Sequence, residues 1–260
     1  MAISARDIHV EIAGRSLVRG ISIDAEAGAV VGLLGPNGAG KSTLIRVLAA
    51  QLRARGTVHV CGRDSAGLSH AARARLIAYL PQQQTIAWPL SVRDIVGLGR
   101  LPWRGWKAED DANGAAICHE AMELMDVAQL AERAGNALSG GEQARVLAAR
   151  AIAQDTPVLL ADEPAAGLDP AHQIEMMAAF RALAARGRAV LVSLHDLTLA
   201  ARWCDRIVIL RNGSVAASGT PDAVMTPAIL GEVYGISVRI DSDEGGLIVA
   251  PLGLLGATAP

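Results

Sequence analysis

The chain has 260 residues, which suits one large α/β domain, and its formal charge of −2 at pH 7 excludes the basic surface typical of nucleic-acid-binding proteins. Hydrophobic residues make up 51% of the chain but aromatic residues only 3%, so the core consists mainly of aliphatic side chains and alanine. Three widely spaced cysteines exclude a disulfide framework, and no apolar run is long enough for a membrane helix. We therefore expect a soluble protein of the reducing cytosol with no nucleic-acid partner.

The N-terminal part of the chain reads as strands that lead into one helix. Apolar residues alternate with polar ones at 5–12 and 16–26, on either side of the turn residue Gly14, which predicts a pair of strands. The continuous apolar run at 29–34 predicts a strand buried on both faces. The other elements expected here are a helix at 44–52 and strands at 56–62 and 75–80.

Residues 84–153 differ in character and are expected to form a mostly helical insertion. Within them, Ile117, Ala121, Leu124 and Met125 recur at positions i, i+4, i+7 and i+8, a spacing that places them on one face of a helix. The insertion therefore interrupts the alternation of strands and helices.

That alternation resumes after the insertion. The elements expected are strands at 157–161 and 188–194, helices at 170–186 and 196–203, a hairpin at 206–218 around Asn212-Gly213, a helix-like stretch near 221–234, and strands at 236–240 and 246–250. Strands that alternate with helices predict a mainly parallel sheet covered by helices on both faces.

We expect one domain over residues 1–260, divided into three parts. Residues 1–83 and 154–235 form the core, 84–153 form a helical subdomain, and 236–260 form a C-terminal β extension and tail. The fold class is α/β, with a mainly parallel core sheet, an antiparallel β subdomain and the inserted helical subdomain.

A glycine-rich sequence joins the strand at 29–34 to the helix after it. Its pattern, G-x-x-x-x-G-K-[ST], is that of a phosphate-binding loop in the strand-to-helix context that this loop requires. Backbone N–H groups of such a loop cradle phosphates, and the helix adds the positive end of its dipole. We expect Lys41 to contact the β- and γ-phosphates of ATP and Ser42 to bind Mg²⁺. The expected ATP-binding residues are Gly35, Pro36, Asn37, Gly38, Ala39, Gly40, Lys41, Ser42 and Thr43.

Two carboxylates follow the apolar strand at 157–161, at the strand end where ligands bind in open α/β sheets. Asp162 is placed to hold the Mg²⁺ shell, and Glu163 to polarise the water that attacks the γ-phosphate. Strands often end in acidic residues, so this pair of carboxylates alone would be weak evidence of a site. It becomes strong evidence because a phosphate-binding loop precedes it in the chain.

The sequence ALSGGEQAR at 137–145 resembles the signature motif of the ATP-binding-cassette (ABC) family. Its hydroxyl and exposed N–H groups at a helix N-terminus suit a γ-phosphate. The resemblance implies a P-loop NTPase fold of the ABC ATPase type. It also implies a head-to-tail homodimer, in which each ATP lies between the loop of one subunit and the signature of the other. The signature residues are Ser139, Gly140, Gly141 and Glu142, the last standing where glutamine is frequent.

Three more residues match motifs of this family. Gln82 matches the Q-loop glutamine that senses Mg²⁺ and the γ-phosphate, Asp169 in AGLDP resembles the D-loop aspartate, and His195 in VSLHD resembles the switch histidine. The resemblance implies catalytic roles for Glu163, His195 and Gln82, an ATP-site role for Asp169, and Mg²⁺ binding by Ser42, Gln82 and Asp162.

Within the family the chain is most similar to importer ATPases for iron–siderophore complexes, haem or vitamin B12. The similarity rests on the single short cassette and on the sequences YLPQ, LSVRDIVGLGRLPW and LHDLTLAARWCDRIVILRNG. It implies a peripheral protein at the cytoplasmic face of the inner membrane that serves separate permease subunits and, indirectly, a periplasmic substrate-binding protein. The alternatives are a soluble ABC ATPase outside transport, or an ABC transporter ATPase for another substrate.

Two features leave their roles open. Many family members stack adenine on an aromatic residue near the end of the first strand, where this chain has Ile12 or His9. A tryptophan cluster at Trp88, Trp103 and Trp106 either lines the groove that receives a cytoplasmic permease helix or packs the core of the helical subdomain.

Overall fold

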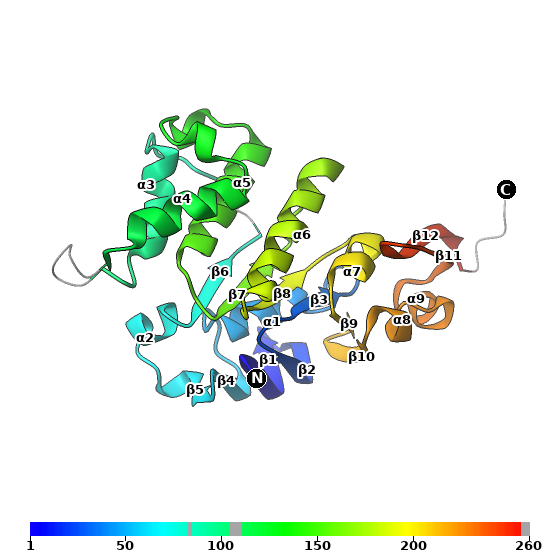
Figure 1. The fold of residues 1–260 in the computed structure, drawn as a ribbon. Coiled ribbons are helices and arrows are strands. Elements are labelled where there is room, and N and C mark those ends of the chain that lie inside the picture. The colour runs from blue at the N-terminus through cyan, green and yellow to red at the C-terminus, as the bar shows by residue number, and fades with distance from the viewer. Residues whose placement is uncertain (83–84, 105–110, 256–260) are drawn as a thin grey trace.

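The computed structural model describes residues 1–82, 85–104 and 111–255, and a six-stranded sheet forms its centre (Figure 1). The strands lie in the order β10-β9-β3-β8-β7-β6. All neighbours from β9 to β6 pair parallel, whereas β10 pairs antiparallel with β9, so the predicted mainly parallel sheet is confirmed. Its strands are β3 (Val30–Leu34), β6 (Ile77–Leu80), β7 (Val158–Asp162), β8 (Ala189–Ser193), β9 (Arg206–Arg211) and β10 (Ser214–Gly219).

An antiparallel sheet built mainly from the N-terminal strands covers one face of the central sheet. Its order is β2-β1-β4-β5. The members are β1 (Ile3–Ile12), β2 (Arg15–Ala25), β4 (Arg55–Val60) and β5 (Arg63–Asp64), and helix α1 (Lys41–Leu48) packs with them. Val31 and Leu33 of β3 point into the apolar core between the antiparallel sheet and the central sheet. This core holds the loop that precedes α1 against both sheets.

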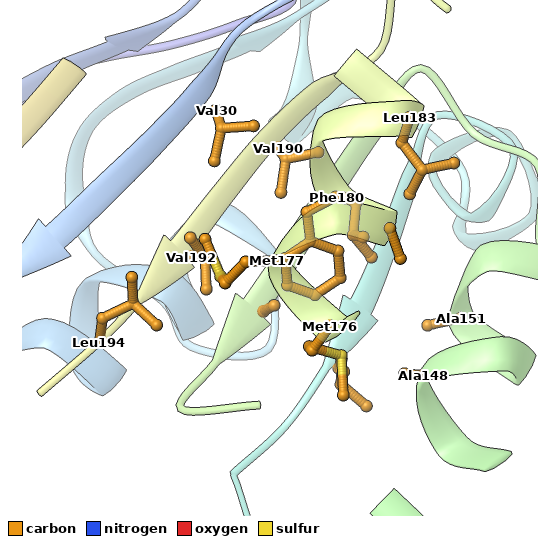
Figure 2. Packing of buried hydrophobic residues seen from close by; sticks show 14 of the residues in the cluster. Val30, Ala148, Ala151, Met176, Met177, Phe180, Leu183, Val190, Val192 and Leu194 are labelled. Atoms are coloured by element: carbon orange, nitrogen blue, oxygen red, sulfur yellow. The ribbon is translucent and has the colours of Figure 1, made fainter. Parts of the chain in front are cut away.

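Helix α6 (Pro170–Ala185) covers the opposite face of the central sheet. Figure 2 shows Met177 and Phe180 of this helix on the side of Val192 and Val190 of β8. Leu191, between those two valines, points into the other core. Because alternate residues of one strand serve the two cores, the strand is fixed in register and its carboxyl end is held in place.

The chain between β6 and β7 forms helices that Figure 1 shows together on one side of the molecule. They are α3 (Val92–Gly97), α4 (Gly114–Leu124) and α5 (Gly140–Ala153). Of the predicted apolar face of α4, Ala121 and Met125 are buried and Leu124 packs half-buried against the same core, whereas Ile117 is half-buried and outside that core. Helix α2 (His70–Ala74) precedes β6, and 3₁₀ turns lie at Ser65–Gly67, Leu98–Arg100, Ala128–Leu130 and Gly135–Ala137.

The C-terminal part differs from its prediction in one respect. The single helix-like stretch expected near 221–234 is two helices, because the Thr226 hydroxyl caps a new start and Pro227 takes the first helical position. The remaining elements are α7 (Leu197–Trp203), α8 (Pro221–Val224), α9 (Pro227–Tyr234), β11 (Ile236–Asp243) and β12 (Gly246–Leu254). Strands β11 and β12, which were predicted as two strands, pair as a terminal hairpin far from α3–α5 in Figure 1. Across the described ranges, no helix combines the length and apolarity needed to span a bilayer.

Candidate active site

The phosphate-binding loop lies between β3 and the first turn of α1, as predicted. Gly40 precedes the helix at φ 103°, and no side chain caps the helix start. A Cβ atom at Gly40 would lie 2.8 Å from the Leu17 carbonyl oxygen, and one at Gly35 would lie 2.3 Å from that of Leu210. Glycine is therefore required at both positions by close backbone approach, and the uncapped N-terminus leaves its donors available to an anion.

Lys41 is buried at the start of α1, and its ammonium group is held by the loop itself. Its Nζ donates to the carbonyl oxygen of Gly35 at 2.7 Å and to that of Pro36 at 3.4 Å. Burial lowers the pKa of Lys41, and the carboxylates of Glu163 and Asp162 partly offset this shift. The ammonium group contacts neutral carbonyls rather than a carboxylate, so an incoming phosphate can take their place.

Asp162 ends β7 and is buried beneath the loop. Its Oδ1 accepts hydrogen bonds from Ser42 Oγ at 3.1 Å and from Ser193 Oγ at 2.7 Å. Ser42 lines the same cavity as Gln82, and Asp162, which lies outside that lining, is joined to it through the Ser42 hydroxyl. Hydroxyl, carboxylate and amide oxygens are the donors that Mg²⁺ prefers. The residues present therefore fit this ion.

Glu163 lies where three neighbouring strands end. Its Oε2 accepts a hydrogen bond from Gln82 Nε2, and its Oε1 lies 2.6 Å from His195 Nε2. The residue has φ 48°, in the left-handed region, and its N–H donates to Ser193 Oγ at 2.8 Å. Because Gln82, Glu163 and His195 follow β6, β7 and β8, the parallel sheet brings together three residues that are distant in sequence.

A cavity of about 400 Å³ opens above the loop. Its lining consists of Leu17, Asn37, Gly38, Ala39, Gly40, Lys41, Ser42, Thr43, Gln82, Glu163 and His195. Seven of the nine predicted loop residues, from Asn37 to Thr43, line the same cavity as the three strand-end residues. An uncapped helix start, a lysine and a carboxylate around one cavity can bind a polyphosphate and act on its terminal group.

The predicted signature residues do not line this cavity. They begin α5, where the Ser139 hydroxyl accepts from the Glu142 N–H at 3.3 Å and Glu142 Oε2 accepts from the Ser139 N–H at 2.7 Å. Glu142 also contacts Arg133 at 3.2 Å. The bond from the Ser139 backbone is the main cause of a lowered pKa of Glu142. This helix start is therefore a reciprocal capping box, satisfied within the chain.

Asp169 caps α6 beside the signature helix. Its Oδ1 accepts from the His172 N–H at 3.0 Å, and this bond is the main cause of a lowered pKa of Asp169. A Cβ atom on Gly141 would lie 3.5 Å from Leu168, the residue before Asp169. The signature and the predicted D-loop are therefore neighbours. Both lie outside the cavity over the phosphate-binding loop of the same chain.

Two residues of the site were missed by sequence reasoning. Ser193 is hidden at the end of an apolar strand, although a polar residue at the same strand end as Asp162 was a usable signal. Leu17 lines the cavity from β2, and nothing in its sequence context marks it. Neither of the two candidates for contact with adenine lines this cavity, and Ile12 is 46% exposed at the end of β1. His9 lines a different cavity and bonds to Asp7.

The tryptophans separate into different environments. Trp103 is half-buried, its indole N–H donates to the Gln154 carbonyl at 2.6 Å, and Arg75 and Arg100 lie over its ring at 5.5 and 5.4 Å. Trp88 is 74% exposed. The position of Trp106 lies outside the described residues. Trp103 therefore packs within the fold, whereas Trp88 stays available to a partner.

Comparison with known proteins agrees with this geometry. The family model described as ABC transporter matches residues 18–166. The hemin import ATP-binding protein HmuV of Streptomyces coelicolor is 43% identical over 251 residues, which are 95% of this chain and 89% of that protein. The cobalamin import ATP-binding protein BtuD of Halobacterium salinarum is 41% identical over 256 residues, 97% of this chain and 64% of that longer protein.

Solved structures agree as well. A dimeric structure of the bacterial ABC transporter cassette MJ0796 has a TM-score of 0.75 at 25% identity, and the match covers 84% of this chain and 98% of that one. A metal-chelate type ABC transporter in an inward-facing conformation has a TM-score of 0.80 at 23% identity over 97% of both chains, which shows a shared fold. The family match spans more than half of this chain, and it includes the loop, the signature and the strand-end carboxylates. The chain belongs to the ABC transporter family, as one of its ATP-binding, ATP-hydrolysing subunits.

Proposed function

We propose that the chain hydrolyses ATP to drive uptake of an iron chelate, such as haem or a siderophore complex, or of cobalamin. The observation that carries the catalytic part is the meeting of Gln82, Glu163 and His195 beside the phosphate-binding loop. In this proposal residues 1–83 and 154–235 form the ATP-binding core and 84–153 carry the signature.

Glu163 acts as the general base. A water oxygen bonds to the γ-phosphorus and its proton passes to the Glu163 carboxylate, while the bond to the β–γ bridging oxygen breaks and ADP leaves. His195 and Gln82 contact the two carboxylate oxygens separately, which fixes the direction in which the base points. Lys41 exchanges its carbonyl contacts for the β- and γ-phosphates.

Mg²⁺ fits beside the loop, where Ser42, Gln82 and Asp162 would hold it. When bound, this ion neutralises charge on the phosphate oxygens. The contribution of the chain is to hold Asp162 in a buried and hydrogen-bonded position before any ligand arrives.

A complete site requires two copies of the chain arranged head to tail. Ser139, Gly140, Gly141, Glu142 and Asp169 lie outside the cavity of their own chain, and this supports their service to a partner's ATP. The dimeric cassette structure, which matches 84% of this chain, supports the same assembly. In a head-to-tail pair each loop faces the partner's signature, so two identical sites form by symmetry.

The import assignment rests on the hemin and cobalamin import proteins that resemble this chain at 43% and 41% identity. It places the dimer at the cytoplasmic face of the inner membrane on separate permease subunits, which a periplasmic binding protein supplies. Exposed Trp88 is the tryptophan that we assign to the permease contact.

Gene deletion followed by growth tests distinguishes the substrates. The deletion strain is grown with haem or a ferric siderophore as sole iron source, or with cobalamin as a required nutrient. We expect growth to fail on one of the three, and the wild-type gene but not Glu163→Gln to restore it. Normal growth on all three would remove the import assignment and leave the ATPase assignment intact.

A further inference from the structure

Ser193 is the last residue of β8 and has no exposed surface. The four residues before it, Ala189 to Val192, are apolar and buried in the two cores. A hydroxyl in such surroundings carries a large desolvation cost unless it forms hydrogen bonds. The register of the parallel strands places Ser193 directly beside Asp162 of β7.

The directions of its two hydrogen bonds follow from the chemistry of the partners. The Glu163 N–H can only donate, so Ser193 Oγ accepts this bond at 2.8 Å. The Asp162 carboxylate only accepts, so the Ser193 hydroxyl donates its single proton to Oδ1 at 2.7 Å. One buried hydroxyl thus joins two consecutive residues that have separate tasks at the site.

Each of these residues needs support that its own chain segment does not give. Glu163 has φ 48°, a conformation that residues other than glycine rarely adopt and that neighbouring structure must hold. In this conformation its carboxylate meets His195 and Gln82. Asp162 Oδ1 has a second hydroxyl partner in Ser42 at 3.1 Å, but Ser42 also lines the ligand cavity. Ser193 lies outside that lining, so its hydroxyl does not have to contact the ligand as well.

We propose that Ser193 is a positioning residue for ATP hydrolysis. Its hydroxyl holds the backbone of the base Glu163 and the carboxylate of Asp162 in one fixed relation, so that both are in place before nucleotide binds. The proposal rests on the roles assigned above to Asp162 and Glu163. It predicts an effect on turnover and on the Glu163 backbone, with ATP affinity nearly unchanged because Ser193 does not line the cavity.

The test compares Ser193→Ala with Ser193→Thr, which keeps the hydroxyl, and with Thr156→Val as a matched control. Thr156 is also buried and its hydroxyl donates to the Val158 carbonyl at 2.8 Å, at the other end of β7 from Asp162. If the alanine variant does not fold, Ser193→Cys replaces it, because a thiol has similar shape and is a weak donor. Each variant is measured for kcat, KM for ATP, ATP affinity in EDTA, and amide hydrogen exchange of the peptide that contains Glu163.

We expect Ser193→Ala to lower kcat about 10–100-fold, the usual cost of losing a residue that orients a catalytic group, with KM and metal-free ATP affinity within about twofold. Exchange at Glu163 becomes faster, and Ser193→Thr restores most of kcat. Thr156→Val lowers thermal stability but leaves kcat and Glu163 exchange unchanged. A kcat of Ser193→Ala within twofold of wild type, or a folded threonine variant no better than alanine, overturns the proposal.

Glu163→Gln is measured in the same series to separate two kinds of failure. If Glu163→Gln keeps the wild-type rate, the assignment of the base is wrong. If Glu163→Gln is inactive while Ser193→Ala turns over normally, the base assignment stands and the positioning role of Ser193 is wrong.

Discussion

Two helices in this molecule begin at a site where a phosphate is expected, and their starts are built differently. Helix α1 begins after Gly40 with no side-chain cap, and Lys41 rests on carbonyl oxygens of the loop. Helix α5 begins at Ser139 with a complete capping box, in which Glu142 closes back on the Ser139 backbone.

The difference indicates an order of events. Donors at an uncapped helix start gain partners when an anion arrives, so the start of α1 favours nucleotide binding by a single chain. The start of α5 is already satisfied by its own side chains, and it gains less from a ligand. A single chain is therefore expected to bind ATP at α1, and α5 of a second chain to complete the site afterwards.

The largest expected effect distinguishes ATP binding from ATP hydrolysis at the site that begins α1. Glu163→Gln removes the base but leaves the loop and Lys41 intact, so we expect ATP binding to persist while turnover falls about 10²–10⁴-fold. The variant should accumulate as an ATP-bound dimer, measured by size-exclusion chromatography with and without ATP. Near-normal ATPase rates would show that Glu163 is not the base.

Mixed dimers test whether the two helix starts belong to different chains. Lys41→Ala disables the α1 side and Ser139→Arg blocks the α5 side, so each variant alone should be inactive. An equal mixture gives half heterodimers with one intact site each, and therefore up to about a quarter of the wild-type rate if sites act independently. Normal hydrolysis by the wild-type chain at dilutions where it is monomeric would contradict the shared site.

The far end of α5 offers a contrast with its self-capped start. There Trp103 donates to the Gln154 carbonyl, while Gln154 Nε2 donates to the carbonyl oxygens of Ala74 and Ile77. Trp103→Ala should lower the free energy of unfolding by about 2 kcal/mol, less than a fully buried tryptophan, as measured by denaturant titration. Trp88→Ala is the control, with a change within about 0.5 kcal/mol. Equal effects of both substitutions would show that the packing of Trp103 against Gln154 does not stabilise the fold.

A smaller expected effect distinguishes the role of Ser139 as a helix cap from its proposed role in ATP hydrolysis. Ser139 and Ser91 are both N-cap residues of helices between β6 and β7, and only the first belongs to the signature. Each serine-to-alanine substitution should lower stability by about 1 kcal/mol, seen as a fall of a few degrees in Tm. ATPase activity at a temperature where both are folded should fall for Ser139→Ala and stay unchanged for Ser91→Ala. Equal ATPase losses would assign the effect to helix stability.

Sequence reasoning placed residues correctly in the fold where the signal lies in consecutive residues. Lys41 and Ser42 follow their glycines directly, and the apolar strand before Asp162 marks its end. It failed for Ser193, whose meaning depends on the β7–β8 register. It also left Trp103 and Trp88 unresolved, because burial depends on segments distant in sequence, such as Gln154 for Trp103.

The position of the contact with adenine shows the same limit, and it carries the smallest predicted effect. Ile12 is 46% exposed at the end of β1, where no aromatic ring stands. Stacking contributes about 0.5–1.5 kcal/mol, so Ile12→Tyr should tighten ATP binding by about twofold to tenfold. Wild type should hydrolyse GTP at a rate comparable to ATP, because loop contacts to phosphates ignore the base. His9→Tyr is the control, because His9 lines a separate cavity and is bonded to Asp7, whereas the Ile12 side chain is exposed. A strong wild-type preference for ATP in competition binding, unchanged in Ile12→Tyr, would mean that another residue holds the adenine.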